Sequence, residues 1–212
     1  MEIVWLGHSC FRLKGRDVTI ITDPHDRTSG YTLGKVTADV VTVSHRAPDH
    51  SNVKAIGGNP RVVDGPGEYE IGGVFITGVA TRRDGSKGRD SERNTAYQIE
   101  IDDLTICHLG DLGHILTPEQ VELMSNADVL LIPVGGNNTI NAGQAAEVVS
   151  QIEPRIVVPM HYKTEVSTLD LDPVGKFLRE MGVKDPTPQP KLTVTRGNLP
   201  EETTVVLLDY RR

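Results

Sequence analysis

The segment Ser44–His50, S-H-R-A-P-D-H, decides how this chain is interpreted. It follows residues 38–43, A-D-V-V-T-V, an apolar run typical of a buried strand. Two imidazoles and a carboxylate are therefore crowded into a tight turn at a strand end. Because such groups are costly to bury alone, a chain that gathers them usually pairs them or uses them to bind a cation. The segment predicts a metal site or a buried polar network.

Composition sets wider bounds. With 212 residues, 37% apolar and 24% charged, the chain is expected to form one domain, 1–212, with an ample core. The net charge of −7 does not favour a nucleic-acid partner, because counterion release by basic residues drives such binding. The only cysteines, Cys10 and Cys107, imply no disulfide framework and fit a reducing compartment. The N-terminus resembles a first strand and not a signal peptide, and no apolar stretch is long enough to span a bilayer. We therefore expect a cytoplasmic protein with a small-molecule substrate and no membrane partner, and a homo-oligomer stays open.

Strand patterns fill the first half of the chain and alternate with helical patterns in the second. The expected strands are residues 3–6, 11–13, 18–22, 40–43, 60–63, 74–79, 96–101, 104–107, 129–133, 156–158, 192–195 and 203–208. The expected helices are residues 118–125, 141–152 and 172–181, with a short one after Ser51. The glycine-rich segment 65–73 is predicted to be mainly a turn, and the charged segment 81–93 a surface loop or a lid that attracts anionic substrates. Two sheet-forming halves with helices predict an α/β sandwich, although periodicity alone is equally consistent with a doubly wound sheet.

Three further polar residues follow predicted strands in the same way. They are Asp23, Asp111 in L-G-D, and His161 after I-V-V-P-M. The order of these motifs resembles the metallo-β-lactamase superfamily. Three segments are similar to its ascorbate-phosphate-lactonase-like branch of small predicted metal-dependent hydrolases: L-G-H-S at 6–9, G-P-G-E-Y-E at 65–70 and P-M-H-Y at 159–162. The resemblance implies an αββα sandwich, with two mixed sheets face to face and helices outside, and metal-dependent hydrolysis.

The resemblance also implies a ligand set. In this superfamily the first metal takes both histidines of an H-x-H motif and a mid-chain histidine, and it shares a bridging aspartate with the second metal. Here His45 matches, but Ala47 stands at the second histidine and Arg83 near the mid-chain one. Since zinc needs about four donors, the first position is not expected to hold metal tightly. The second position would hold zinc, manganese or iron with a water that attacks a small ester, lactone or phosphate-bearing substrate; its donors are Asp49, His50, Asp111 and His161.

Several roles within this site stay open. Asp49 or Asp111 would be the general base, and Asp23 would orient the histidine turn. His45, without its partners, is either a residual ligand or a hydrogen-bonded core histidine. His8 borders the cleft in the related branch, where it would shuttle protons or make a structural hydrogen bond.

Arginine offers an alternative to the first metal. Arg83 or Arg46 would neutralise Asp111 by forking onto its carboxylate. The site would then be mononuclear, or the protein would be a non-catalytic binding or interaction module that has lost its metals. The second interpretation predicts an arginine–Asp111 contact and no bound transition metal. A nuclease is a third class, and the net charge of −7 disfavours it.

Overall fold

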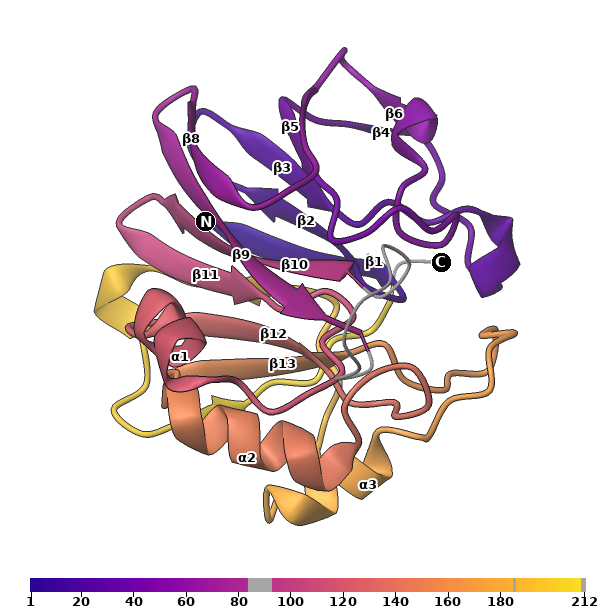
Figure 1. The fold of residues 1–212 in the computed structure, drawn as a ribbon, viewed down its shortest axis with the longest axis vertical. Coiled ribbons are helices and arrows are strands. Elements are labelled where there is room, and N and C mark those ends of the chain that lie inside the picture. Colours follow the sequence, from indigo (N-terminus) through magenta and orange to yellow (C-terminus); the bar gives the residue numbers. More distant parts are fainter. Residues whose placement is uncertain (84–92, 185, 211–212) are drawn as a thin grey trace.

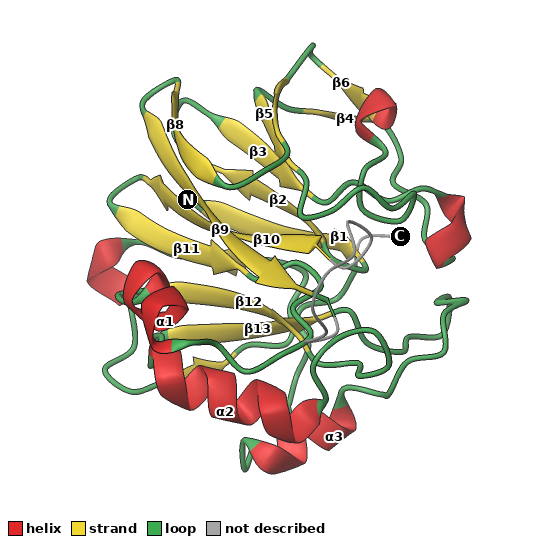
Figure 2. Ribbon diagram, viewed as in Figure 1, coloured by secondary structure: helices red, strands yellow, loops and turns green. Residues whose placement is uncertain are grey.

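The computed structural model describes residues 1–83, 93–184 and 186–210, so most of the predicted charged loop or lid lies outside the described residues. The described chain forms two main sheets that pack face to face (Figures 1 and 2). The first sheet has the strand order β14 (Leu192–Thr193), β1 (Glu2–Gly7), β2 (Cys10–Lys14), β3 (Thr19–Thr22), β5 (Val40–Thr42) and β7 (Arg61–Val63). The second has the order β15 (Thr204–Val205), β13 (Ile156–Met160), β12 (Val129–Pro133), β11 (Leu104–His108), β10 (Arg93–Ile101), β9 (Val74–Arg82) and β8 (Gly67–Ile71).

Both sheets are mixed, and their connections explain where the polar turns fall. In the first sheet β1, β2 and β3 pair antiparallel, whereas β3, β5 and β7 pair parallel. In the second, β8 to β11 pair antiparallel, and β11, β12, β13 and β15 pair parallel. Parallel neighbours need a long crossover. The segment Ser44–His50 lies in the crossover from β5 to β7, at the end where β5 stops.

The core lies between the sheets. Trp5 and Phe11 from the first sheet and Tyr97 and Ile106 from the second belong to one buried cluster, each 1% exposed or less. The Tyr97 hydroxyl donates to the carbonyl of Val43 over 2.8 Å, so it ties the second sheet to the start of the histidine turn. A buried hydroxyl with a partner avoids the cost of a lone polar group.

The outer face of the second sheet is covered by helices α1 (Pro118–Met124), α2 (Ala142–Ile152) and α3 (Gly175–Glu180) (Figure 1). Helix α2 begins at a capping box of Asn141 and Gln144, and it buries Ala145, Val148 and Ile152. The outer face of the first sheet is covered differently. The short strands β4 (Val36–Thr37) and β6 (Ile56–Gly57) and a 3₁₀ turn at Val53–Ala55 pack there.

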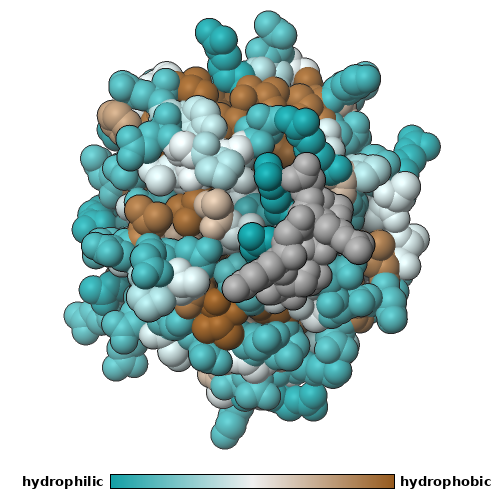
Figure 3. All heavy atoms as spheres, in the orientation of Figure 1, coloured by the Kyte–Doolittle hydropathy of each residue, from teal (hydrophilic) through white to brown (hydrophobic). Residues whose placement is uncertain are grey.

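The predicted αββα fold class is confirmed, although the structure adds the unpredicted strands β4 and β6 and differs from the expectation in two predicted segments. The short helix expected after Ser51 is only the 3₁₀ turn, so the predicted outside helices cover one sheet. Segment 65–73, expected to be mainly a turn, contains the edge strand β8, because an edge strand tolerates the preceding Pro66. No helix among the described residues is long and apolar enough to cross a membrane. The face shown in Figure 3 is mainly hydrophilic, with apolar surface in separate areas.

Candidate metal centre

Six strand-end segments bring polar side chains to one end of the sandwich. His8 follows β1, Asp23 follows β3, Arg83 follows β9, Asp111 follows β11 and His161 follows β13, and the histidine turn follows β5. All these strands end at the same edge because of the pairing described above. The topology therefore gathers groups that lie far apart in the sequence: His8 and His161 are 153 residues apart (161 − 8).

Asp111 lies at the centre of this cluster and has two distinct sides. Its Oδ1 is 3.2 Å from Nε2 of His50 and 3.2 Å from Nε2 of His161. Its Oδ2 is 3.2 Å from Nη2 of Arg83 and 3.6 Å from Nε2 of His45. The side chain is 1% exposed, and among the described residues neither oxygen has a hydrogen bond of good geometry. A buried carboxylate in this state fits a cation.

The position of Asp111 is fixed by its backbone. Its N–H donates to Oδ1 of Asn94 over 2.9 Å, and the Asn94 amide donates to Oγ1 of Thr81 and to the carbonyl of Leu109. Gly110 before it has φ +56°, and a Cβ there would clash with the Cβ of Ser44. This close approach to the histidine turn needs a glycine.

Asp23 holds His50 in place. Nδ1 of His50 lies 2.8 Å from Oδ2 of Asp23, and both side chains are fully buried. Ser44 donates to the same carboxylate from its backbone N–H at 2.7 Å and from its hydroxyl at 2.6 Å. Such a carboxylate on the far nitrogen turns Nε2 of a histidine toward a metal. Asp23 thus makes the contact expected of an orienting residue.

His8 lies closer to the cluster than the sequence analysis suggested. Its Nε2 is 3.0 Å from Nε2 of His50 and 3.3 Å from Oδ2 of Asp49, and its ring centroid is 4.2 Å from that of His161. The ligand atoms of His8, His50 and His161 all lie within 4.8 Å of one another, and so do those of His45, His50 and Asp111. The signal for His8 in the sequence is its place directly after a buried strand, like the other candidates.

Burial and charge set the protonation of these groups. Burial lowers the pKa of His161 to about 3 and that of His45 to about 4. Burial also acts to lower the pKa of His50, but the charge of Asp111 and the hydrogen bond with Asp23 outweigh it and raise this pKa to about 9. Burial acts to raise the pKa of Asp111, yet the neighbouring imidazoles, His50 first, hold it well below its usual range. The metal-free cluster thus contains one imidazolium beside ionised carboxylates.

Arg46 does not lie in this cluster, which corrects one sequence expectation. Its side chain is 84% exposed and pairs with Asp64 at 3.0 Å on the surface. The preceding residue His45 points inward, so the tight turn directs Arg46 to solvent. Of the two arginines considered, Arg83 is the one that contacts Asp111. Ala47 supplies no donor side chain at the place of the second H-x-H histidine.

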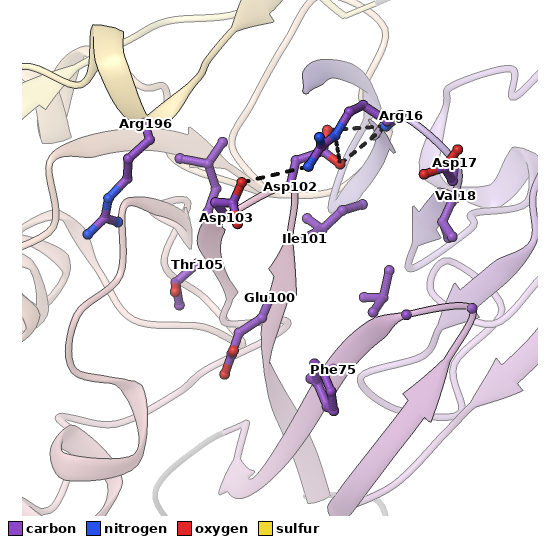
Figure 4. A pocket seen from close by; sticks show the side chains of 14 residues that line it. Arg16, Asp17, Val18, Phe75, Glu100, Ile101, Asp102, Asp103, Thr105 and Arg196 are labelled. Carbon is purple, nitrogen blue, oxygen red and sulfur yellow. Dashed lines mark hydrogen bonds and ion pairs between the residues drawn. The ribbon is translucent and has the colours of Figure 1, made fainter.

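A separate open pocket of about 610 Å³ lies at the opposite end of the strands (Figure 4). It is lined by the turns between β2 and β3, β8 and β9, and β10 and β11. Arg16 pairs there with Asp102 and Asp103, and Arg196 pairs with Asp128. No histidine is among its lining residues, and its arginines have acidic partners. Among the described residues, the two groups of side chains that could hold a metal ion lie at the other end.

An αββα sandwich with a histidine–aspartate cluster at its strand ends defines a class of metal-binding folds. A model of the β-lactamase superfamily domain matches residues 2–161. The chain belongs to the metallo-β-lactamase superfamily. A UPF0173 protein of Pyrococcus furiosus is 35% identical over 184 residues, covering 77% of this chain and 84% of that protein. A UPF0173 metal-dependent hydrolase of Pyrococcus horikoshii is 34% identical over 199 residues, covering 77% of this chain and 85% of the relative. A solved structure from Thermotoga maritima, described as a Zn-dependent hydrolase of the superfamily, is 40% identical, covers 99% of each chain and has a TM-score of 0.83.

Proposed function

We propose that this protein is a hydrolase that works with one divalent cation, held by Oδ1 of Asp111, the imidazoles of His50 and His161, and Asp49. The two-sided contacts of Asp111 carry the proposal. In two-metal sites a carboxylate bridges both ions. Here one oxygen of Asp111 faces imidazoles, and the other faces the guanidinium of Arg83. Relatives called metal-dependent hydrolases support the same class.

The charges of the cluster favour one cation over two. Three carboxylates, of Asp23, Asp49 and Asp111, lie around His50, and the one guanidinium of the cluster, of Arg83, contacts Asp111. One divalent cation makes this set neutral once the proton of His50 has left. A second divalent cation would leave two excess positive charges in a buried place, which is costly. Arg83 therefore supplies positive charge where a first metal would lie, but it cannot coordinate a water as a metal does.

A bound divalent cation lowers the pKa of a coordinated water and so supplies a nucleophile near neutral pH. Asp49 is the better placed of the two predicted general bases, because it is 21% exposed whereas Asp111 is 1% exposed. Burial acts to raise the pKa of Asp49, but the hydrogen bond with His8 and the charge of His50 outweigh it and hold this pKa below its usual range, so the carboxylate is ionised and can accept a hydrogen bond from the water. Arg83, 24% exposed, offers its guanidinium to negative charge that develops on the substrate. The substrate we propose is a small ester, lactone or phosphate-bearing molecule.

Metal loading followed by substrate screening tests this proposal. Protein stripped with a chelator is reloaded with zinc, manganese or iron, and bound metal is counted by mass spectrometry. We expect one equivalent, and hydrolysis of at least one chromogenic ester, lactone or phosphodiester that ends when the chelator is added. Less than a tenth of an equivalent after loading would refute the proposal. Anomalous diffraction across the metal edges would identify the element.

The Arg83–Asp111 contact also favours a second candidate, a non-catalytic member of the fold that serves as a binding or interaction module. That interpretation predicts this contact, since a guanidinium neutralises a buried carboxylate without any metal. The two candidate functions differ in what Oδ1 of Asp111 binds: the hydrolase holds a cation there, and the non-catalytic module holds none. A crystal structure of the metal-loaded protein with density between His50 and His161 would eliminate the second candidate.

A further inference from the structure

The distances around His8 match those between ligands of one ion. Ligands bound at about 2.0–2.1 Å lie roughly 3.3 Å apart around a tetrahedral ion, and roughly 2.9 Å apart at right angles. Nε2 of His8 is 3.0 Å from Nε2 of His50 and 3.3 Å from Oδ2 of Asp49. The pairs made by Asp111 Oδ1 with His50 and with His161 are both 3.2 Å. The His8–His50 pair and the two Asp111 pairs fall within the range for donors that share a cation, and the contact with His8 places the carboxylate of Asp49 beside these donors.

A purely structural role explains the ring of His8 poorly. The residue is 1% exposed, and its Nδ1 has no hydrogen-bond partner among the described residues. Its Nε2 faces the Nε2 of another imidazole, and two such nitrogens can share only one proton. A histidine kept for packing normally has a hydrogen-bond partner at both ring nitrogens. His108 is an example, because its Nε2 lies 2.8 Å from the Ser9 carbonyl and its Nδ1 accepts from the Gly110 N–H.

The backbone brings His8 and His161 together. His8 has φ +54° and His161 has φ +51°, in the left-handed region that non-glycine residues seldom adopt. The N–H of His161 donates to the carbonyl of His8 over 3.2 Å, so the two strand ends are joined. The indole N–H of Trp5 donates to the same carbonyl over 2.9 Å. Strained residues held by their surroundings at one spot are a common feature of ligand sites.

We propose that His8 is a ligand of the cation, so that three imidazoles, of His8, His50 and His161, and Oδ1 of Asp111 hold it. This inference rests on the proposed function. It explains how one cation is retained although Ala47 and Arg83 remove two histidines from the first position. In this set His8 takes the place that the proposed function gave to Asp49, so that the Asp49 carboxylate is available as the base. A set of three imidazoles and one carboxylate suits zinc.

The variant His8→Asn tests the proposal, because asparagine tolerates the left-handed backbone at this position. Three readouts are compared with the unmodified protein: the zinc Kd from competition with a chromogenic chelator, the visible absorption of the cobalt(II) form, and the number of imidazoles from X-ray absorption. We expect the unmodified protein to show three imidazoles. The variant should show two and bind zinc about 100-fold more weakly or worse, since even indirect partners of a ligating histidine change affinity about 10–100-fold.

The matched control is His114→Gln. His114 lies outside the cluster, and its Nε2 accepts the backbone N–H of Arg82, which a glutamine oxygen can also do. The control should keep the affinity and the spectrum. If His8→Asn also keeps both, His8 is not a ligand and the inference is overturned, while the proposed function stands. If the unmodified protein binds no zinc, the proposed function itself fails.

A second variant covers the case in which His8→Asn does not fold. His8→Gly removes the strain of a side chain at a left-handed backbone position and leaves a space of the size of an imidazole. Free imidazole at millimolar concentration should then restore zinc affinity and the cobalt(II) spectrum. Folded His8→Gly protein that binds zinc as tightly without imidazole as the unmodified protein, or that imidazole does not rescue, would overturn the inference.

Discussion

Removing the guanidinium of Arg83 should destabilise the metal-free protein. Nη2 of Arg83 lies 3.2 Å from Oδ2 of Asp111, which is 1% exposed, while Arg83 is 24% exposed. At an effective dielectric constant of about 20, opposite charges at this distance attract by about 5 kcal/mol. Water near Arg83 screens part of this attraction. Because Arg83→Ala also leaves the Asp111 carboxylate buried with less compensation, we expect the free energy of unfolding to fall by about 2–4 kcal/mol.

Arg46→Ala is the matched control for Arg83→Ala. It removes the same side chain from a surface pair, in which Arg46 is 84% and Asp64 49% exposed. Such a pair contributes at most about 1 kcal/mol. Both variants are unfolded with urea in the presence of a chelator at pH 7, and the midpoints and slopes are compared with the unmodified protein. If the two variants lose equal stability, the Arg83–Asp111 pair is not the charge replacement that we infer.

Four further predictions concern the same centre. The double variant Ala47→His, Arg83→His should bind a second equivalent of zinc, counted by native mass spectrometry, and one equivalent as in the unmodified protein would mean that the cleft is remodelled. In the metal-free protein His50 should be an imidazolium at pH 7, with the pKa near 9 visible in an NMR titration. Because this pKa is above the ordinary value near 6.5, protonated His50 stabilises the folded protein. This contribution to the free energy of unfolding is complete below about pH 6.5 and is lost as the pH rises through about 9. Asp23→Asn should lower this pKa, and an unchanged value would contradict the role given to Asp23. Asn94→Ala removes three buried hydrogen bonds at the turn after β11 and should cost about 2–4 kcal/mol in urea unfolding, whereas a loss below about 0.5 kcal/mol would contradict that role.

Much of the fold follows from local sequence patterns. Strands β12 and β13 are buried on both faces and appear as continuous apolar runs. Helix α2 carries its start signal in Asn141 and Gln144. Strand β8 was missed because Gly67 and the preceding Pro66 are turn residues, and its pairing with β9 depends on tertiary context. The 3₁₀ turn after Ser51 was too short for periodicity to distinguish from a helix.

The candidate site is predictable in part for the same reason. The strand-end positions of His50, Asp111 and His161 can be read from the sequence, and the structure places Nε2 of each imidazole 3.2 Å from Oδ1 of Asp111. The proximity of His8 depends on how β1 and β13 are juxtaposed, which no local pattern contains. Arg46 and Arg83 are equivalent as charges in the sequence. Only the direction in which each side chain leaves its turn separates them.

The left-handed backbone at His8, Asp23 and His161 has a consequence for how this protein changes over time. Each position would relax by about 1 kcal/mol if glycine replaced the present side chain, provided that the side chain had no other use. At His8 and His161 a lineage freed from the need for imidazole would regain this energy by drifting toward glycine, whereas the carboxylate of Asp23 is also needed for its buried bonds to Ser44 and His50. Laboratory selection for thermal tolerance alone should therefore replace His8 and His161 before Asp23, whereas selection that also demands bound metal should preserve all three residues.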